Sequence, residues 1–263
     1  MNTKVNNAKD DNLKTESKIE KGKIVEFNTS LRGTGSPTII FESGLGTPLN
    51  NWDKIQTSIS ANYQTISYDR KGLGESPATD KPRTLDNLVN DLDSLITQNE
   101  IDGPIILVGH SLGGHIVRMY QQSFPSKIAG MFLIDPTNEY LYEEVFKQMT
   151  QIAADSMKTA WDNSYKKGQM GVYKEWKEVY GIDKIMRKHP LPENIPITIL
   201  ASYQGNRFMT KTNIEIKEKL FSDWKKDKAN VKILNTINSG HYIHLGEPQW
   251  VITELEKYLK SLE

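Results

Sequence analysis

The sequence predicts an α/β protein with a doubly wound, mostly parallel sheet and a helical segment inserted late in the sheet. Three observations favour this fold class. Short, β-branched, apolar runs alternate with amphipathic runs along most of the chain. The short runs are apolar on both alternations, which is typical of strands in a parallel sheet that is covered on both faces. One long stretch interrupts the alternation and contains no convincing strand.

Strand-like runs recur from residue 23 onward. They cover residues 23–27, 37–42, 63–69, 104–109, 130–135, 196–201 and 231–237. Because helical patterns lie between most of them, the chain is expected to form right-handed crossovers and one sheet with helices on both faces.

Amphipathic runs lie between the strands. They predict helices over 84–99, 112–124 and 213–226, and a last helix that begins at Pro248. In the helix over 213–226, the apolar stripe is expected to hold Ile216, Leu220 and Trp224. Thr84 is a plausible N-cap, and Pro248 suits a first helical turn.

Residues 137–192 predict several helices and no strand. Their many Met, Trp and Tyr side chains suit an adaptable apolar lid. We expect a mostly helical cap, inserted after the strand at 130–135 and lying over the carboxyl edge of the sheet. The predicted organisation is therefore a disordered polar tail over 1–22, an α/β core over 23–136 and 193–263, and the cap over 137–192.

The charge balance argues against partners that are selected by charge. Lys+Arg and Asp+Glu both number 33, so the formal net charge is zero. Neither nucleic acid nor an anionic membrane surface is expected as a partner. No run approaches the roughly 18 apolar residues of a transmembrane helix, so no integral membrane segment is expected. The oligomeric state stays open.

The chain contains no cysteine. This excludes disulfides, thiolate metal sites and a cysteine nucleophile. No cluster of metal ligands is visible in the sequence, and we expect neither a metal nor a cofactor.

The N-terminal residues have the composition of a solvated tail. Residues 1–23 contain only Met1, Val5, Leu13 and Ile19 as sizeable apolar side chains, so they cannot supply the apolar stretch of a signal peptide. A polar tether of this kind can follow an export or lipid-anchor signal. We expect a soluble protein that is either cytoplasmic or exported, with the signal or anchor segment absent from this chain.

The strongest local signal is the sequence Gly109-His110-Ser111-Leu112-Gly113-Gly114. It lies between a buried strand and an amphipathic helix, which is the context of a nucleophile elbow. On so tight a turn, the residues two positions before and two positions after the nucleophile lie close to neighbouring backbone. These positions are Gly109 and Gly113, which have no side chain to clash. The following helix directs its first amides, including that of Leu112, toward charge that develops on a substrate. We predict that Ser111 is a catalytic nucleophile.

A serine hydroxyl needs a general base to become a good nucleophile. His241 follows the last strand, in a loop at the carboxyl edge where the functional loops of open α/β sheets cluster. By contrast, His110 lies inside the elbow, His115 is expected to pack on the next helix, and His244 is expected to be structural or close to the site. We predict that His241 is the base.

Taken together, these segments resemble the α/β-hydrolase family. Members show a strand ending in a glycine loop, a second strand ending in a glycine-containing loop, the elbow and a histidine loop. The matching segments here are 41–46 (FESGLG), 68–76 (YDRKGLGES), 109–114 (GHSLGG) and 239–244 (SGHYIH) followed by Glu247-Pro248. The resemblance runs from about Lys23 to the C-terminus and is weak only over 137–192. The first loop is similar to that of esterase-like members.

The resemblance implies an oxyanion hole formed by two backbone amides, those of Leu45 and Leu112. It also implies a carboxylate that holds the histidine, and here the chain departs from the commonest pattern. Many members carry this acid after the strand that follows the cap, but this chain has no carboxylate there until Glu215. Asp135 stands at the other position that the fold permits, the end of the strand after the elbow helix. We predict Asp135 as the acid.

Together these residues predict a serine hydrolase that cleaves carboxylic esters of small to medium apolar substrates through an acyl-serine intermediate. A small-molecule substrate is therefore the expected partner. A peptidase or amidase, a C–C or thioester hydrolase, and a perhydrolase would use the same residues and stay open. A non-catalytic ligand-binding protein of the same fold is a further alternative, against which the complete set of Ser, His and Asp argues.

Overall fold

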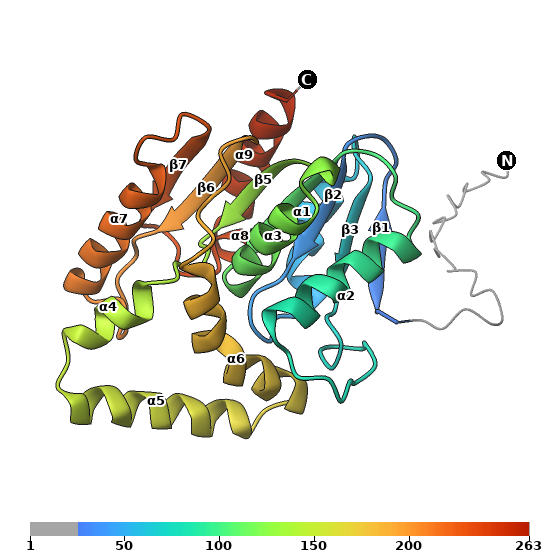
Figure 1. Ribbon diagram of the computed structural model, residues 1–263. Helices are drawn as coiled ribbons and strands as arrows, with labels where there is room; N and C mark the ends of the chain where they lie inside the picture. The colour runs from blue at the N-terminus through green and yellow to red at the C-terminus, as the bar shows by residue number, and fades with distance from the viewer. Residues whose placement is uncertain (1–25, 263) are drawn as a thin grey trace, which may run out of the picture.

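Within residues 26–262, the sheet has seven strands. The computed structural model describes residues 26–262 (Figure 1). The strands are β1 (Thr29–Arg32), β2 (Thr38–Glu42), β3 (Thr65–Tyr68), β4 (Ile105–His110), β5 (Ile128–Ile134), β6 (Ile197–Ser202) and β7 (Val231–Thr236). Their order is β1-β3-β2-β4-β5-β6-β7; β1 runs antiparallel to β3, and the other neighbours are parallel. The predicted mostly parallel sheet is therefore confirmed.

Helices cover both faces of the sheet (Figure 1). On one face, α2 (Leu85–Gln98) packs against α3 (Leu112–Ser123), and α7 (Lys211–Lys225) adds Phe221 and Trp224 to the same core. On the other face, α1 (Asp53–Ile59) packs against α9 (Pro248–Lys260). The short helical turns are η1 (Leu49–Trp52), η2 (Pro125–Lys127) and α8 (Ile243–Gly246). Because both faces are covered, all residues of β2, β3, β4 and β6 are buried.

The helix-start signals in the sequence act as expected. The Thr84 hydroxyl accepts a hydrogen bond from the Asn87 amide at the start of α2. Pro248 is the first residue of α9. These local signals place both helix starts within about one residue of the prediction.

The prediction of a strand over 23–27 is wrong where the structure describes it. Residues 23–25 lie outside the described residues, as does the predicted tail over 1–22, and Glu26 and Phe27 are not in a strand. The first strand is β1, an edge strand in which exposed and partly buried residues alternate. Phe27 is buried because its ring packs edge-on against Tyr68, with ring centroids 5.6 Å apart. The apolar run thus marks a core contact that precedes the strand.

A helical segment separates β5 from β6. It consists of α4 (Leu141–Lys147), α5 (Gln151–Lys166) and α6 (Met170–Met186), which extend from one end of the sheet (Figure 1). A buried ion pair fixes α6 to the core, because Glu175 accepts hydrogen bonds of 2.7 Å from both Nε and Nη2 of Arg70. Arg70 lies just beyond the end of β3, so α6 contacts the carboxyl edge of the sheet.

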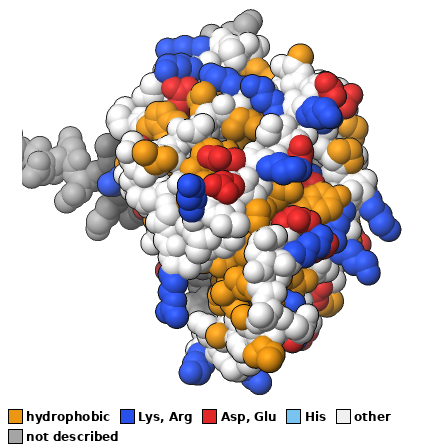
Figure 2. Space-filling model, turned by 90° about the vertical axis from the view of Figure 1, so that its left-hand side faces the viewer, with side chains coloured by type: hydrophobic (Ala, Val, Ile, Leu, Met, Phe, Trp, Pro, Cys, Tyr) orange, Lys and Arg blue, Asp and Glu red, His pale blue; other side chains and the backbone are white. Residues whose placement is uncertain are grey.

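The surface formed around α4, α5 and α7 is of mixed character. Figure 2 shows acidic and basic side chains interspersed with hydrophobic patches on this side of the molecule. This face therefore presents no extended field of one sign, which agrees with the zero net charge of the chain. Within residues 26–262, no helix is both long enough and apolar enough to span a bilayer.

Candidate active site

The candidate site lies where the connections of the sheet change direction. The chain leaves β2 toward β3 on one side and leaves β4 toward β5 on the other, although β2 and β4 are neighbours. In open α/β sheets, such a switch point forms a crevice at the carboxyl ends of the strands. The loop after β2 and the turn after β4 meet there, and they carry Leu45 and Ser111.

Ser111 stands on a strained turn between β4 and α3. Its φ is +52° and its ψ is −119°, a conformation that non-glycine residues rarely adopt. The turn requires small neighbours: a Cβ on Gly113 would lie 2.4 Å from the carbonyl oxygen of Glu42, and one on Gly109 would lie 2.8 Å from Val117. This local geometry is what the elbow sequence predicts.

Ser111, His241 and Asp135 form one hydrogen-bonded chain. The Ser111 hydroxyl lies 2.8 Å from Nε2 of His241, to which it donates. The Nδ1 N–H of His241 donates to Oδ2 of Asp135 at 2.7 Å. The imidazole is 45% exposed, whereas the Asp135 side chain is 3% exposed. The acid is therefore shielded from water, while the other end of the chain is open to a small molecule.

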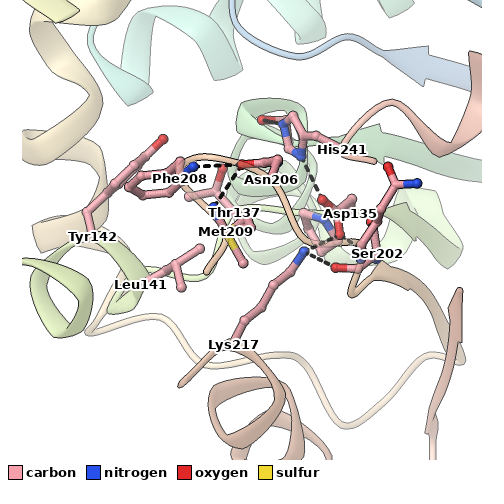
Figure 3. Close-up of a pocket in the computed structure, with 13 residues that line it drawn as sticks. Asp135, Thr137, Leu141, Tyr142, Ser202, Asn206, Phe208, Met209, Lys217 and His241 are labelled. Carbon is pink, nitrogen blue, oxygen red and sulfur yellow. Dashed lines mark hydrogen bonds and ion pairs between the residues drawn. The ribbon is translucent and has the colours of Figure 1, made fainter. Parts of the chain in front are cut away.

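The Asp135 carboxylate accepts hydrogen bonds from other groups besides His241. Its Oδ1 accepts hydrogen bonds from the Ser202 amide at 2.8 Å and from Nζ of Lys217 at 2.5 Å (Figure 3). Burial alone would raise the pKa of Asp135, but the Lys217 charge and the hydrogen bond from His241 hold that pKa below its usual value. The carboxylate therefore stays ionised at neutral pH and can accept from the imidazole.

Lys217 is a residue of the site that the sequence reasoning missed. It is 4% exposed on α7, and its Nζ also donates to the Ser202 carbonyl at 2.8 Å. The buried stripe of α7 consists of Asn213, Lys217, Phe221 and Trp224. The predicted Trp224 is therefore buried, whereas the predicted Ile216 and Leu220 are only partly buried. A lysine in helical register with Phe221 and Trp224 was the available signal. Glu215, the alternative carboxylate, is exposed on α7.

Arg70 orients the loop after β2. Its guanidinium donates to the carbonyls of Ser43 at 2.6 Å and Gly44 at 2.8 Å. In a trans peptide the N–H points opposite to the C=O, so the Leu45 amide points away from Arg70. Neither this amide nor that of Leu112, the first residue of α3, donates a hydrogen bond to another residue in the described part of the chain. Both residues line a cavity beside Ser111.

Two further histidines lie behind His241. Nε2 of His110 donates to the backbone carbonyl of His241 at 3.0 Å. His244 stacks on Trp52, with ring centroids 4.6 Å apart, and neither of its ring nitrogens has a hydrogen-bond partner among residues 26–262. Burial lowers the pKa of His110 well below its usual value and lowers that of His244 to about 4. Both rings are therefore neutral supports of the loop that carries His241.

The low pKa of His244 predicts how stability depends on pH. An unfolded chain takes up this proton near pH 6.5, whereas the folded protein resists it down to about pH 4, so the free energy of unfolding should fall as the pH drops from 6.5 to 4. His244→Phe keeps the stacking and removes the titration. Between pH 7 and 5, wild type should lose about 2 kcal/mol more than this variant in urea unfolding. Equal losses in both proteins would show that His244 does not drive the dependence.

The two remaining histidines, His115 and His189, make hydrogen bonds outside the chain from Ser111 to Asp135. Nε2 of His115 on α3 lies 3.0 Å from Oδ1 of Asp183 on α6, and Nδ1 of His189 lies 2.6 Å from the Gln122 side chain. Within residues 26–262, no group of three or more His, Asp or Glu side chains is arranged to hold a metal ion.

Comparisons with known proteins agree with this architecture. A family model described as alpha/beta hydrolase fold matches residues 37–151. The chain is 26% identical over 232 residues to the uncharacterised protein YqjL of Bacillus subtilis, covering 86% of this chain and 85% of that protein. It is also 26% identical over 196 residues to the human mitochondrial palmitoyl-protein thioesterase ABHD10, covering 71% of this chain and 63% of that protein.

A solved structure extends the likeness to nearly the whole chain. A thermophilic esterase from Thermogutta terrifontis superposes with a TM-score of 0.63 at 16% identity, covering 90% of this chain and 93% of that one. At this identity the likeness shows the fold alone. With the family match, it confirms the fold class predicted from the sequence.

Proposed function

Because this chain belongs to the α/β-hydrolase fold superfamily, we propose that it is a serine hydrolase that cleaves carboxylic esters of small to medium apolar substrates. One observation carries the proposal: the unbroken hydrogen-bonded chain from Ser111 through His241 to Asp135, set on a strained elbow. This is the geometry that an activated serine nucleophile requires.

The proposed reaction proceeds through an acyl-serine. Ser111 Oγ attacks the ester carbonyl while Nε2 of His241 takes its proton, and Asp135 stabilises the resulting imidazolium. The imidazolium then protonates the leaving alcohol, and the C–O bond of the ester breaks. Water activated by the same imidazole attacks the acyl-serine, which releases the carboxylic acid and restores the Ser111 hydroxyl.

The amides of Leu45 and Leu112 are the proposed oxyanion donors. Both residues line the cavity beside Ser111, and neither amide has a hydrogen-bond partner within residues 26–262. Fixed N–H donors stabilise the negative charge of the tetrahedral intermediate without reorganising during the reaction. Arg70 supports this arrangement, since it holds the Gly44 carbonyl and hence the orientation of the Leu45 peptide.

The proposed substrate size rests on the cavity next to the nucleophile. This cavity has a volume of about 220 Å³ and reaches from Ser111 and His241 to Leu141, Phe208 and Met209 (Figure 3). Its apolar end is formed in part by the insertion, which we propose acts as a cap over residues 23–136 and 193–263. A cavity of this size suits a short hydrocarbon chain better than a long one.

A series of 4-nitrophenyl esters with acyl chains from acetate to palmitate tests the proposal. We expect turnover that is highest for short or medium chains and falls for the longest ones. Heat-unfolded protein serves as the control for spontaneous hydrolysis. If no ester in the series is hydrolysed above that control, the proposed function is wrong.

Thioester hydrolysis is a second candidate function. It is favoured by the similarity to a protein named palmitoyl-protein thioesterase, and the same nucleophile attacks both kinds of carbonyl. Matched oxygen and sulfur esters of one acyl group distinguish the two candidates. A kcat/KM for the thioester that exceeds that of the ester by more than their difference in spontaneous reactivity would favour this alternative.

The contact between Lys217 and Asp135 predicts that substitution of Lys217 will slow turnover. Lys217→Met removes one of the two groups that fix Oδ1 of Asp135, so kcat should fall by about 10- to 100-fold, the effect of losing a hydrogen bond to a charged group. Lys217→Arg should recover part of this loss. Lys219→Met, on the exposed face of the same helix, is the control and should match wild type. A kcat for Lys217→Met within threefold of wild type would exclude this role.

A further inference from the structure

Two cavities of different chemistry meet at Ser111. The cavity toward Leu141, Phe208 and Met209 is apolar at its far end. The second, of about 160 Å³, adjoins Leu45 and Leu112 and is bounded mainly by polar side chains. These are His115, Thr137, Tyr142, Tyr165, Asp183 and Tyr242. The candidate nucleophile thus stands between an apolar compartment and a polar one.

The polar side chains of the second cavity have spare hydrogen-bonding capacity. Within residues 26–262, the hydroxyls of Thr137, Tyr142, Tyr165 and Tyr242 make no hydrogen bond. In Figure 3 the Tyr142 hydroxyl points away from Leu141 and Lys217. Polar groups at such a cavity are expected to find partners, so these hydroxyls are available to water or to a substrate.

A buried pair forms another wall of this cavity. His115 and Asp183 are 1% and 3% exposed, and Nε2 of His115 donates to Oδ1 of Asp183. This tautomer leaves Nδ1 of His115 as an acceptor, and Nδ1 has no partner in the described part of the chain. A contact that served only to join α3 to α6 could be made by apolar side chains, as it is where Ile182 and Met186 of α6 share a core cluster with Ile116 of α3.

We propose that this second cavity is a polar subsite that binds a neutral hydrogen-bonding group of the substrate, such as a hydroxyl, close to the scissile carbonyl. The inference rests on the proposed function, because it assigns the substrate class of the same site. A hydroxyl can donate to the Asp183–His115 pair and accept from a tyrosine hydroxyl. The lining contains Asp183 and neither Lys nor Arg, so an anionic group is disfavoured.

Matched ester pairs test the subsite. The acyl pair is 4-nitrophenyl butyrate and 4-nitrophenyl 3-hydroxybutyrate, and the alcohol pair is propyl butyrate and 2-hydroxypropyl butyrate. In at least one pair, the kcat/KM of the hydroxylated ester should exceed that of its partner by about five- to tenfold, the contribution of one net hydrogen bond. The pair that responds identifies which side of the ester occupies the cavity. The anionic 4-nitrophenyl hemisuccinate should be the poorest substrate.

Two variants and a control locate the effect. Tyr165→Phe and Asp183→Asn each change one polar group of the cavity, so each should reduce the preference for the hydroxylated ester by at least threefold. Tyr180→Phe removes a hydroxyl from the same helix as Asp183, but Tyr180 borders a different cavity, and the preference should be unchanged.

The possible outcomes separate this inference from the proposed function. Hydrolysis of the plain esters without any preference for their hydroxylated partners overturns the subsite and leaves the esterase activity standing. A preference that persists undiminished in both Tyr165→Phe and Asp183→Asn also overturns it. If wild type hydrolyses none of the esters, the proposed function fails and the subsite fails with it.

Discussion

Ser111→Ala should lower kcat/KM for 4-nitrophenyl esters by roughly 10⁴- to 10⁶-fold, the range seen when the nucleophile of a serine hydrolase is removed. The loss is large because the hydroxyl is the atom that forms the covalent bond, and no neighbouring group can replace it. The substitution removes one oxygen from the open end of the hydrogen-bonded chain. The free energy of unfolding should therefore stay close to that of wild type, or rise if the strained site relaxes.

A matched serine provides the control for this variant. Ser126 is exposed in η2, on a part of the surface away from the candidate site, so Ser126→Ala should retain full activity. Circular dichroism and thermal unfolding of both variants establish that they are folded. If Ser111→Ala retains more than about a tenth of the wild-type rate, Ser111 is not the nucleophile.

Asp135→Asn should reduce turnover by roughly 10³- to 10⁴-fold, by analogy with loss of the acid in serine proteases. The Asn carbonyl can still accept from Lys217 and the Ser202 amide, which leaves the amide NH₂ facing Nδ1 of His241. Two donors cannot hydrogen-bond, so the imidazole shifts its proton to Nε2 and can no longer accept from Ser111. The substitution therefore changes which ring nitrogen of His241 carries the proton, and it leaves the position of the imidazole unchanged.

The backbone should tolerate this substitution. Asp135 has a φ of +41°, and Asn adopts positive φ about as readily as Asp. Glu215→Gln is the control, because Glu215 is the alternative carboxylate that the sequence offered; it should leave the rate unchanged. A loss of less than tenfold in Asp135→Asn, or a large loss in Glu215→Gln, would rule out Asp135 as the acid.

The residues of the hydrogen-bonded chain could be predicted because each one follows a strand of the parallel part of the sheet. Ser111, Asp135 and His241 come after β4, β5 and β7, and the carboxyl ends of parallel strands share one edge of the sheet. Short apolar runs reveal such strands clearly. Asp135 needed one further step, since it was assigned from the lack of a carboxylate after the strand at 196–201.

Features that depend on packing between distant segments could not be predicted in this way. Lys217 lies 82 positions after Asp135 in the chain and reaches it from α7. It is buried because the buried face of α7 includes Lys217, which the apolar pattern of the sequence did not indicate. Likewise, Glu175 meets Arg70 because α6 folds back over the loop after β3. The edge strand β1 was missed because it lacks the apolar pattern of a covered strand.

Covalent labelling with a fluorophosphonate tests the central claim most directly, because this reagent reacts with activated serine hydroxyls. Intact-mass spectrometry should show wild type gaining the mass of one phosphonyl group, and peptide mapping should place it on Ser111. Ser111→Ala should gain none under the same conditions. Labelling of Ser111→Ala at full stoichiometry, or a wild-type adduct that maps to any other residue, would contradict the assignment of Ser111 as the nucleophile.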